Sequence, residues 1–143
     1  MSRLDAAVHD ARASGDYDRL LNELPYARFL GLTAQLRGDV VVVRLPFRPL
    51  VIGNVRQNAL HGGVVGACLE CAGLLQLIHA RGLPLPKTID FTVDYLRLAR
   101  DQELCAEAEV QRLGRRVANV RMRAYQQGGD EPVALGRGNF LLG

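Results

Sequence analysis

Lysine is almost absent from this chain of 143 residues, since Lys87 is the only one. Arginine therefore supplies nearly all of the positive charge behind a formal net charge of +3. So small a surplus, with no basic stripe and no base-reading module, argues against a nucleic-acid-binding domain. The arginines either form an ordinary solvated surface or bind small anions, because the guanidinium group matches phosphate and carboxylate oxygens.

Cysteine is also scarce, and three residues cannot form a complete disulfide framework. A reducing, cytoplasmic setting is therefore expected. The first residues contain no apolar core and no cleavage signal, so secretion is not expected. The chain lacks a glycine-rich phosphate loop, a serine nucleophile elbow and an apolar run long enough to span a membrane, so no membrane partner is expected.

Apolar residues make up 48% of the chain and charged residues 23%, which is typical of a folded globular protein. The length suits a single domain over residues 1–143. Apolar residues at helical spacing predict one or two short helices over residues 4–24, a helical extension that Pro25 would end.

Most of the remaining chain predicts β-strands. Residues 26–36 are interpreted as a turn entering a strand, Gly38-Asp39 as a hairpin turn, and residues 46–60 as a loop. Period-two alternation places Thr88, Thr92, Asp90 and Asp94 on one face of their strand. Turns are predicted at Gly114 and at 128–130, and strands at 40–45, 88–96, 103–112, 115–126 and 132–142.

Residues 64–79 predict a helix of a different kind, because apolar residues occupy all of its faces and Glu70 is its only formally charged residue. Its end is predicted near Arg81-Gly82. Such a helix must be buried on nearly every side. The fold class is therefore α+β, with an antiparallel β-sheet wrapped around a long central helix.

The sequence His61-Gly62-Gly63 lies where the loop turns into this helix. The first amides of a helix have no acceptor within the helix and carry partial positive charge. Paired glycines let a ligand approach such amides closely, and a thioester oxygen that becomes negative on attack is a suitable ligand. The alternative is a tight turn in which His61 caps the helix or packs.

Glu70 is a carboxylate in an otherwise uncharged helix, so it must have a partner, face a cavity or take part in chemistry. An ion pair with an arginine is the structural alternative. Eight residues separate Gly62 from Glu70, about 12 Å along a helix axis. One carbonyl group cannot contact both groups within one chain. If both serve one reaction, the protein is a homodimer with its active sites across the interface.

These features resemble the hotdog-fold acyl-CoA thioesterases of the phenylacetate-degradation type. The resemblance covers the chain from about Phe29 to Leu142. It implies hydrolysis of an acyl-CoA to a free acid and CoA by a homodimer that assembles to a homotetramer. It implies no metal and no cofactor, since CoA is part of the substrate.

The resemblance also implies roles for individual residues. The Gly62 N–H would polarise the thioester carbonyl, and the neighbouring Gly63 would contact the substrate. His61 would orient the thioester group or its neighbours. Glu70 would act as general base or nucleophile, and Thr88 of the same subunit would position the water or the carboxylate.

Two further sets of residues are assigned by the same resemblance. Relatives often have an Asn or Gln six residues before the histidine to support the carbonyl, but this chain has Val55 there. Asn54 is the expected substitute, with Asn58 as a further contact to the substrate. Arg115 and Arg116, beside the Gly114 turn, are expected to hold the nucleotide end of CoA.

Two other functions remain open. A non-catalytic acyl-CoA-binding or sensing domain would share the fold but would not need the acid. A hydratase or dehydratase of this fold generally uses a different loop arrangement.

The pair Cys68 and Cys71 predicts core packing rather than zinc, because four ligands are not available. His9 and His79 are interpreted as isolated residues at the surface or at helix ends.

Overall fold

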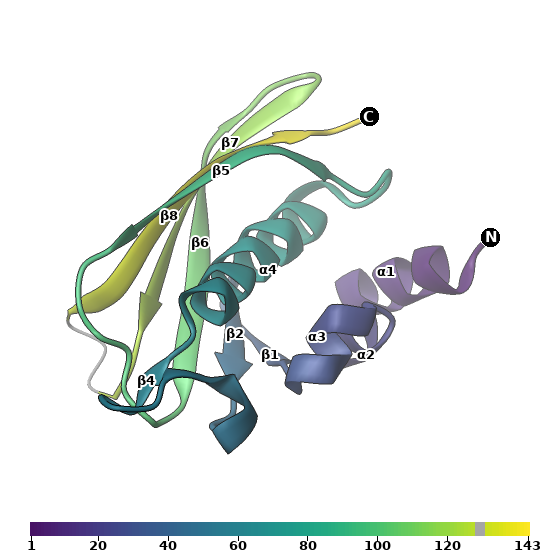
Figure 1. The fold of residues 1–143 in the computed structure, drawn as a ribbon. Helices are drawn as coiled ribbons and strands as arrows, with labels where there is room; N and C mark the ends of the chain where they lie inside the picture. The colour runs from purple at the N-terminus through teal and green to yellow at the C-terminus, as the bar shows by residue number, and fades with distance from the viewer. Residues whose placement is uncertain (128–130) are drawn as a thin grey trace.

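Six antiparallel strands form the main sheet of the computed structural model, which describes residues 1–127 and 131–143. They lie in the order β1-β2-β6-β7-β8-β5, so β1 and β5 are the two edges (Figure 1). Apart from β1, each strand begins and ends within two residues of its predicted range, and the turn predicted at 128–130 lies outside the described residues. The strands are β1 Thr33–Arg37, β2 Val40–Leu45, β5 Lys87–Tyr95, β6 Leu104–Leu113, β7 Val117–Tyr125 and β8 Pro132–Leu141.

Helix α4 (Gly62–Arg81) lies in the curve of this sheet (Figure 1). Its buried residues join the inner faces of β2, β6, β7 and β8 in one core. The predicted hotdog fold, a sheet wrapped around a central helix, is confirmed. By length and composition alone α4 could cross a membrane, but most of it is buried within this core.

Helix α4 begins two residues before its predicted range and ends at Arg81, where its end was predicted, and both of its ends are capped. His61 caps the first turn, and Gly82, with φ +85°, ends the helix while its N–H donates to Ile78 O. The prediction of burial on nearly every side is wrong for one stripe. This stripe is half-buried or exposed and consists of Gly63, Ala67, Glu70, Cys71 and Leu74.

The N-terminal segment forms three helices: α1 (Arg3–Ser14), α2 (Asp18–Asn22) and α3 (Pro25–Leu30). The prediction that Pro25 ends the helices and that a turn follows is wrong. Pro25 starts α3, because proline at the first helical position has the right φ and needs no hydrogen-bond acceptor. His79, expected to be isolated, has a partner, since its Nδ1 lies 2.7 Å from the hydroxyl of buried Tyr17.

The segment predicted as a loop over 46–60 contains short regular elements. They are the 3-10 helix η1 (Pro49–Val51) and the two-stranded hairpin of β3 (Ile52–Asn54) and β4 (Ala59–Leu60). Strands of two and three residues are too short to show period-two alternation in the sequence. This hairpin leads the chain directly into α4.

Strand β5 contains a β-bulge that corrects the predicted faces. Thr88 pairs with Phe140 and Phe91 with Gly138, and the register shifts between Thr88 and Asp90. Phe140 and Gly138 are two residues apart, so Thr88 and Phe91 share the inner face although three positions separate them. The prediction that Thr88 shares a face with Asp90 is therefore wrong. The extra residue turns Thr88 toward α4.

Candidate active site

The chain enters α4 at His61, whose extended backbone (φ −62°, ψ 130°) makes it the N-cap residue. Its N–H donates to Val51 O at 2.8 Å, and Gly53 of β3 lies directly against it. A Cβ atom on Gly53 would lie 2.6 Å from the His61 Cα. Only glycine lets the hairpin approach the turn this closely.

We expect Gly53→Ala to lower the free energy of unfolding by about 1–3 kcal/mol, because the new methyl group meets backbone that cannot move aside. Urea denaturation followed by circular dichroism measures the change. Gly66→Ala is the matched control, since its Cβ atom would lie 3.6 Å from the nearest atom, an ordinary contact. The control should be neutral or stabilising because alanine favours helix over glycine. Equal stability of Gly53→Ala and the native protein would contradict the packing argument.

The Gly62 N–H is the free donor at this helix terminus, since none of the described residues accepts from it. The carbonyl of the same peptide unit, His61 O, accepts from Val64 N at 3.0 Å and Val65 N at 3.1 Å. Two hydrogen bonds to the oxygen polarise the peptide and strengthen its N–H as a donor. The partial positive charge of the helix N-terminus acts in the same direction. The site can stabilise an oxyanion.

The Gly63 N–H has a different task, because it donates to His61 Nδ1 at 2.9 Å. A Cβ atom on Gly63 would lie 3.0 Å from both Nδ1 and Cε1 of the ring, so glycine leaves room for this cap. The two glycines therefore differ in their backbone N–H groups. The Gly62 N–H stays free, and the Gly63 N–H donates to the histidine ring.

Tyr95, the last residue of β5, also contacts this turn, although no sequence motif singles it out. Its hydroxyl donates to Gly62 O at 2.6 Å, and its ring packs over the first turn of α4. The only sequence signal was its position at the end of the alternating apolar face of β5.

Glu70 lies two turns further along α4 and is half-buried in the single chain. Its Oε2 accepts a hydrogen bond from the Thr88 hydroxyl at 2.9 Å. No arginine or lysine pairs with it among residues 1–127 and 131–143. The structural alternative of an ion pair with an arginine is therefore not found among the described residues, whereas the structure does bring Glu70 and Thr88 together. The free carboxylate oxygen is available as a base or nucleophile.

Strand β5 thus runs alongside α4 in the opposite direction and holds it at two points. Tyr95 contacts the start of the helix, and Thr88 contacts Glu70. The structure brings His61, Gly62 and Gly63 together in one turn, but within one chain Glu70 remains two helical turns, about 12 Å, away from them.

The side chain of Asn54, the asparagine expected to support the carbonyl group, is engaged within its own hairpin. Asn54 uses both ends of its side-chain amide on Gln57, donating from Nδ2 at 3.1 Å and accepting at Oδ1 at 3.3 Å. Asn58 adopts the left-handed conformation (φ 49°) in the same hairpin, a backbone that asparagine tolerates well. Both residues shape the turn that leads to His61.

Arg115 and Arg116 lie exposed in the turn between β6 and β7. The register places this turn beside the start of β5, because Leu141 pairs with both Val117 and Lys87. Three basic side chains therefore gather at the end of the sheet where Thr88 contacts Glu70. The structure separates them from the same chain's His61 turn, which lies at the other end of β5.

The cysteines near the site are not reactive. Burial raises the pKa of Cys68 far above its ordinary value and that of Cys71 to about 12, where the Glu70 carboxylate adds to the effect. The described residues contain no group of three or more His, Cys, Asp or Glu arranged to hold a metal ion.

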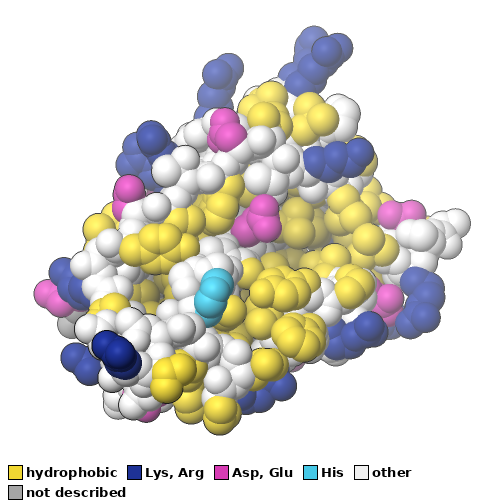
Figure 2. Space-filling view, viewed as in Figure 1, with side chains coloured by type: hydrophobic (Ala, Val, Ile, Leu, Met, Phe, Trp, Pro, Cys, Tyr) yellow, Lys and Arg dark blue, Asp and Glu magenta, His cyan; other side chains and the backbone are white. Residues whose placement is uncertain are grey.

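One face of the molecule combines these features (Figure 2). A histidine and an acidic side chain lie in the middle of a largely hydrophobic surface over the first half of α4. A cavity of about 220 Å³ lies beside Gly62 and Tyr95, with a mainly apolar lining that includes Leu60, Val65 and Leu98.

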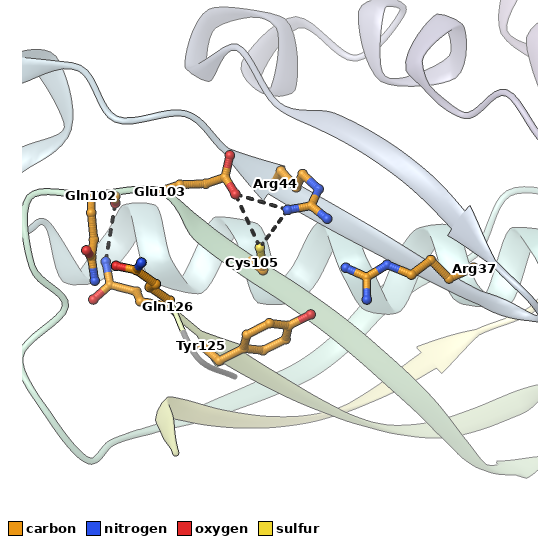
Figure 3. Close-up of a pocket in the computed structure, with 8 residues that line it drawn as sticks. Arg37, Arg44, Gln102, Glu103, Cys105, Tyr125 and Gln126 are labelled. Carbon is orange, nitrogen blue, oxygen red and sulfur yellow. Dashed lines mark hydrogen bonds and ion pairs between the residues drawn. The ribbon is translucent and has the colours of Figure 1, made fainter. Parts of the chain in front are cut away.

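A larger cavity of about 450 Å³ lies on the opposite face of the sheet, away from α4 (Figure 3). Arg44 points into it and pairs with Glu103 at 3.0 Å, above the Cys105 thiol. Tyr125 and Arg37 extend along its other side. The sheet separates this cavity from the His61 turn, so it is not part of the candidate active site.

The profile of the family described as "Thioesterase superfamily" matches residues 57–133, more than half of the chain and the segment that holds the site. The chain belongs to the thioesterase superfamily. The matched segment runs from the hairpin before His61 to the start of β8. It includes both contacts of β5 with α4, so the family signal and the site geometry coincide.

Individual proteins also resemble the chain over most of its length. YigI of Salmonella typhimurium, a medium/long-chain acyl-CoA thioesterase, is 31% identical over 120 residues, 73% of this chain and 77% of that protein. A Chromobacterium violaceum crystal structure has a TM-score of 0.77 at 35% identity, covering 96% of this chain and 97% of that one. A phenylacetic acid degradation-related protein of Ralstonia eutropha JMP134 has a TM-score of 0.74 at 20% identity, covering 87% and 98%, a likeness of fold alone.

Proposed function

We propose that this protein hydrolyses acyl-CoA thioesters to the free acid and CoA, with medium- and long-chain acyl groups as its substrate class. The observation that carries the proposal is the pair of groups on α4. One is the Gly62 N–H without an acceptor among the described residues, and the other is the accessible carboxylate of Glu70. The acyl class follows from the relative named a medium/long-chain acyl-CoA thioesterase.

In this mechanism the Gly62 N–H donates to the thioester oxygen, which becomes negative when the carbonyl carbon is attacked. Glu70 either removes a proton from the attacking water or attacks the carbon itself to form an anhydride that water then hydrolyses. Thr88 keeps the carboxylate in place. The C–S bond breaks, the CoA sulfur takes up a proton, and the free acid leaves.

Both groups meet one substrate only if they come from different subunits, so we propose a homodimer, with a tetramer as a pair of dimers. Two features support a second copy of the chain as the partner. Strand β5 is an edge strand of nine residues that pairs only with β8 in the described structure and exposes Ile89, Tyr95 and the following Leu96. The adjoining stripe of α4 is also uncovered and contains small residues that permit close approach.

The nucleotide end of CoA is proposed to bind Arg115 and Arg116, with Lys87 beside them. Neither arginine has a carboxylate partner in the described part of the chain. Guanidinium groups bind phosphate oxygens in bidentate fashion. All three cysteines are free thiols, which suits the reducing, cytoplasmic setting expected from the sequence.

The test is release of free thiol from butyryl-, octanoyl-, lauroyl-, palmitoyl- and phenylacetyl-CoA, followed with a chromogenic disulfide. We expect kcat/KM on the order of 10⁴ M⁻¹ s⁻¹ or more for the lauroyl or palmitoyl ester. Preference for phenylacetyl-CoA would instead favour the phenylacetate-degradation type. Saturable binding of every ester without turnover would contradict the enzyme and favour the acyl-CoA-binding alternative.

A further inference from the structure

The hydroxyl group of Tyr95 and the ring of His61 are connected through a single peptide unit. Tyr95 Oη donates to Gly62 O at 2.6 Å, and the N–H of the same peptide, on Gly63, donates to His61 Nδ1 at 2.9 Å. A hydrogen bond to the oxygen of an amide draws electron density from its nitrogen and strengthens its N–H as a donor. The two bonds therefore reinforce each other.

This connection decides which nitrogen of His61 carries the proton. A neutral imidazole has one donor and one acceptor nitrogen, and Nδ1 is the acceptor here. The proton is then on Nε2. The His61 side chain is exposed, so this N–H can donate a hydrogen bond to a bound ligand.

Tyr95 packs against the start of α4 as it reaches the carbonyl. A Cβ atom on Gly62 would lie 3.4 Å from the ring and its hydroxyl, and one on Gly66 would lie 3.6 Å from the hydroxyl oxygen. Both are ordinary contact distances, so the tyrosine packs closely against the first turns of α4 and an alanine at either position would leave it in place. No other side chain bonds the Gly62–Gly63 peptide in the described part of the chain.

We propose that Tyr95 is a positioning residue that holds His61 as the Nε2–H tautomer through the Gly62–Gly63 peptide. Its catalytic consequence rests on the proposed thioesterase function, in which His61 orients the thioester beside the Gly62 N–H. The tautomer itself does not depend on that function. Tyr95 acts through the peptide and needs no contact with the substrate.

The variant Tyr95→Phe tests this because it keeps the ring and its packing and removes only the hydroxyl group. The matched control is Tyr26→Phe on α3, where the ring stacks on Phe29 and the hydroxyl has no partner among the described residues. Histidine labelled with ¹⁵N gives the tautomer of each ring from its nitrogen chemical shifts, at a pH where imidazole is neutral. The variant His61→Gln assigns the His61 signals.

In the native protein we expect His61 to be predominantly the Nε2–H tautomer. Tyr95→Phe should increase the Nδ1–H form about five- to tenfold, the effect of losing one hydrogen bond. It should lower kcat only in proportion to the Nε2–H population that is lost, by about twofold, and leave KM within about twofold, since substrate binding is not the step affected. Tyr26→Phe should change neither quantity.

Unchanged nitrogen shifts in Tyr95→Phe, or a native His61 that is mainly Nδ1–H, would overturn the proposal. A fall in kcat without a change of tautomer would also overturn it, because it would assign Tyr95 a different role. A native protein that hydrolyses no acyl-CoA would contradict the proposed function, and the nitrogen shifts would still decide the role of Tyr95.

Discussion

Replacing Glu70 by glutamine should lower kcat for acyl-CoA hydrolysis by about 10³-fold or more while KM stays within about twofold. Glutamine has nearly the same shape and still accepts the hydrogen bond that Thr88 donates at 2.9 Å. It cannot accept a proton from water or attack a carbonyl group. The fold and the binding surface should therefore persist while the chemistry stops. Thiol release under saturating acyl-CoA measures kcat, and thermal unfolding checks the fold.

The matched control is Glu109→Gln on β6, an exposed glutamate on the opposite side of the sheet. It removes the same charge and should leave kcat unchanged. A Glu70→Gln variant that keeps more than about a tenth of the native kcat would rule out both roles for the carboxylate. Label found in Glu70 after a single turnover in ¹⁸O-labelled water then identifies an anhydride whose Glu70 carbon is attacked by water, because the general-base route places label only in the product acid.

The central helix and its glycine turn were predictable because their signals are local. An apolar run of helical length, a histidine and two glycines at its start, and Gly82 at its end all lie within one short segment. The alternating strands β6 and β7 were predictable for the same reason. A lone acid in the apolar helix was enough to select Glu70 as the candidate catalytic group.

The orientation of Thr88 could not be derived from alternation, because a bulge shifts the strand by one residue. The family resemblance selected Thr88, whereas period-two reasoning placed it with Asp90 on the wrong face. A bulge depends on how β5 pairs with β8, some 50 residues later in the chain. Its sequence signal is therefore spread over two distant segments.

The contacts of Tyr95 and Asn54 also could not be derived from local sequence patterns. The role of Tyr95 depends on the contact between the end of β5 and the start of α4, 33 residues apart in sequence. Asn54 was selected from its position near His61, but its side chain binds Gln57 in the hairpin. Spacing in sequence does not show where a side chain in a tight hairpin points.

Replacing Gly62 by proline should lower kcat by about 10²- to 10³-fold, the usual effect of removing one donor from an oxyanion site. The substitution removes the free N–H and fits the local backbone in two ways. Position 62 is the first residue of α4, where proline is favoured, and His61 has the extended backbone that a residue before proline requires. Gly62→Ala keeps the N–H and adds a Cβ atom 3.4 Å from Tyr95, so it is the matched control and should retain most activity. Similar losses in the two variants would show that crowding, and not the donor, is responsible.

The same variant tests whether the site is shared between subunits. A mixed dimer of Glu70→Gln and Gly62→Pro has one site with both defects and one site with neither, if each site takes Gly62 from one chain and Glu70 from the other. Random pairing makes half of the dimers mixed, so coexpression of the two inactive chains should restore about a quarter of the native activity. Activity that remains at the sum of the two variants would contradict a site across the twofold axis. It would also contradict the role of Glu70 as the partner of the neighbouring chain's Gly62 N–H, because within one chain the helix keeps these two groups too far apart for a single carbonyl group.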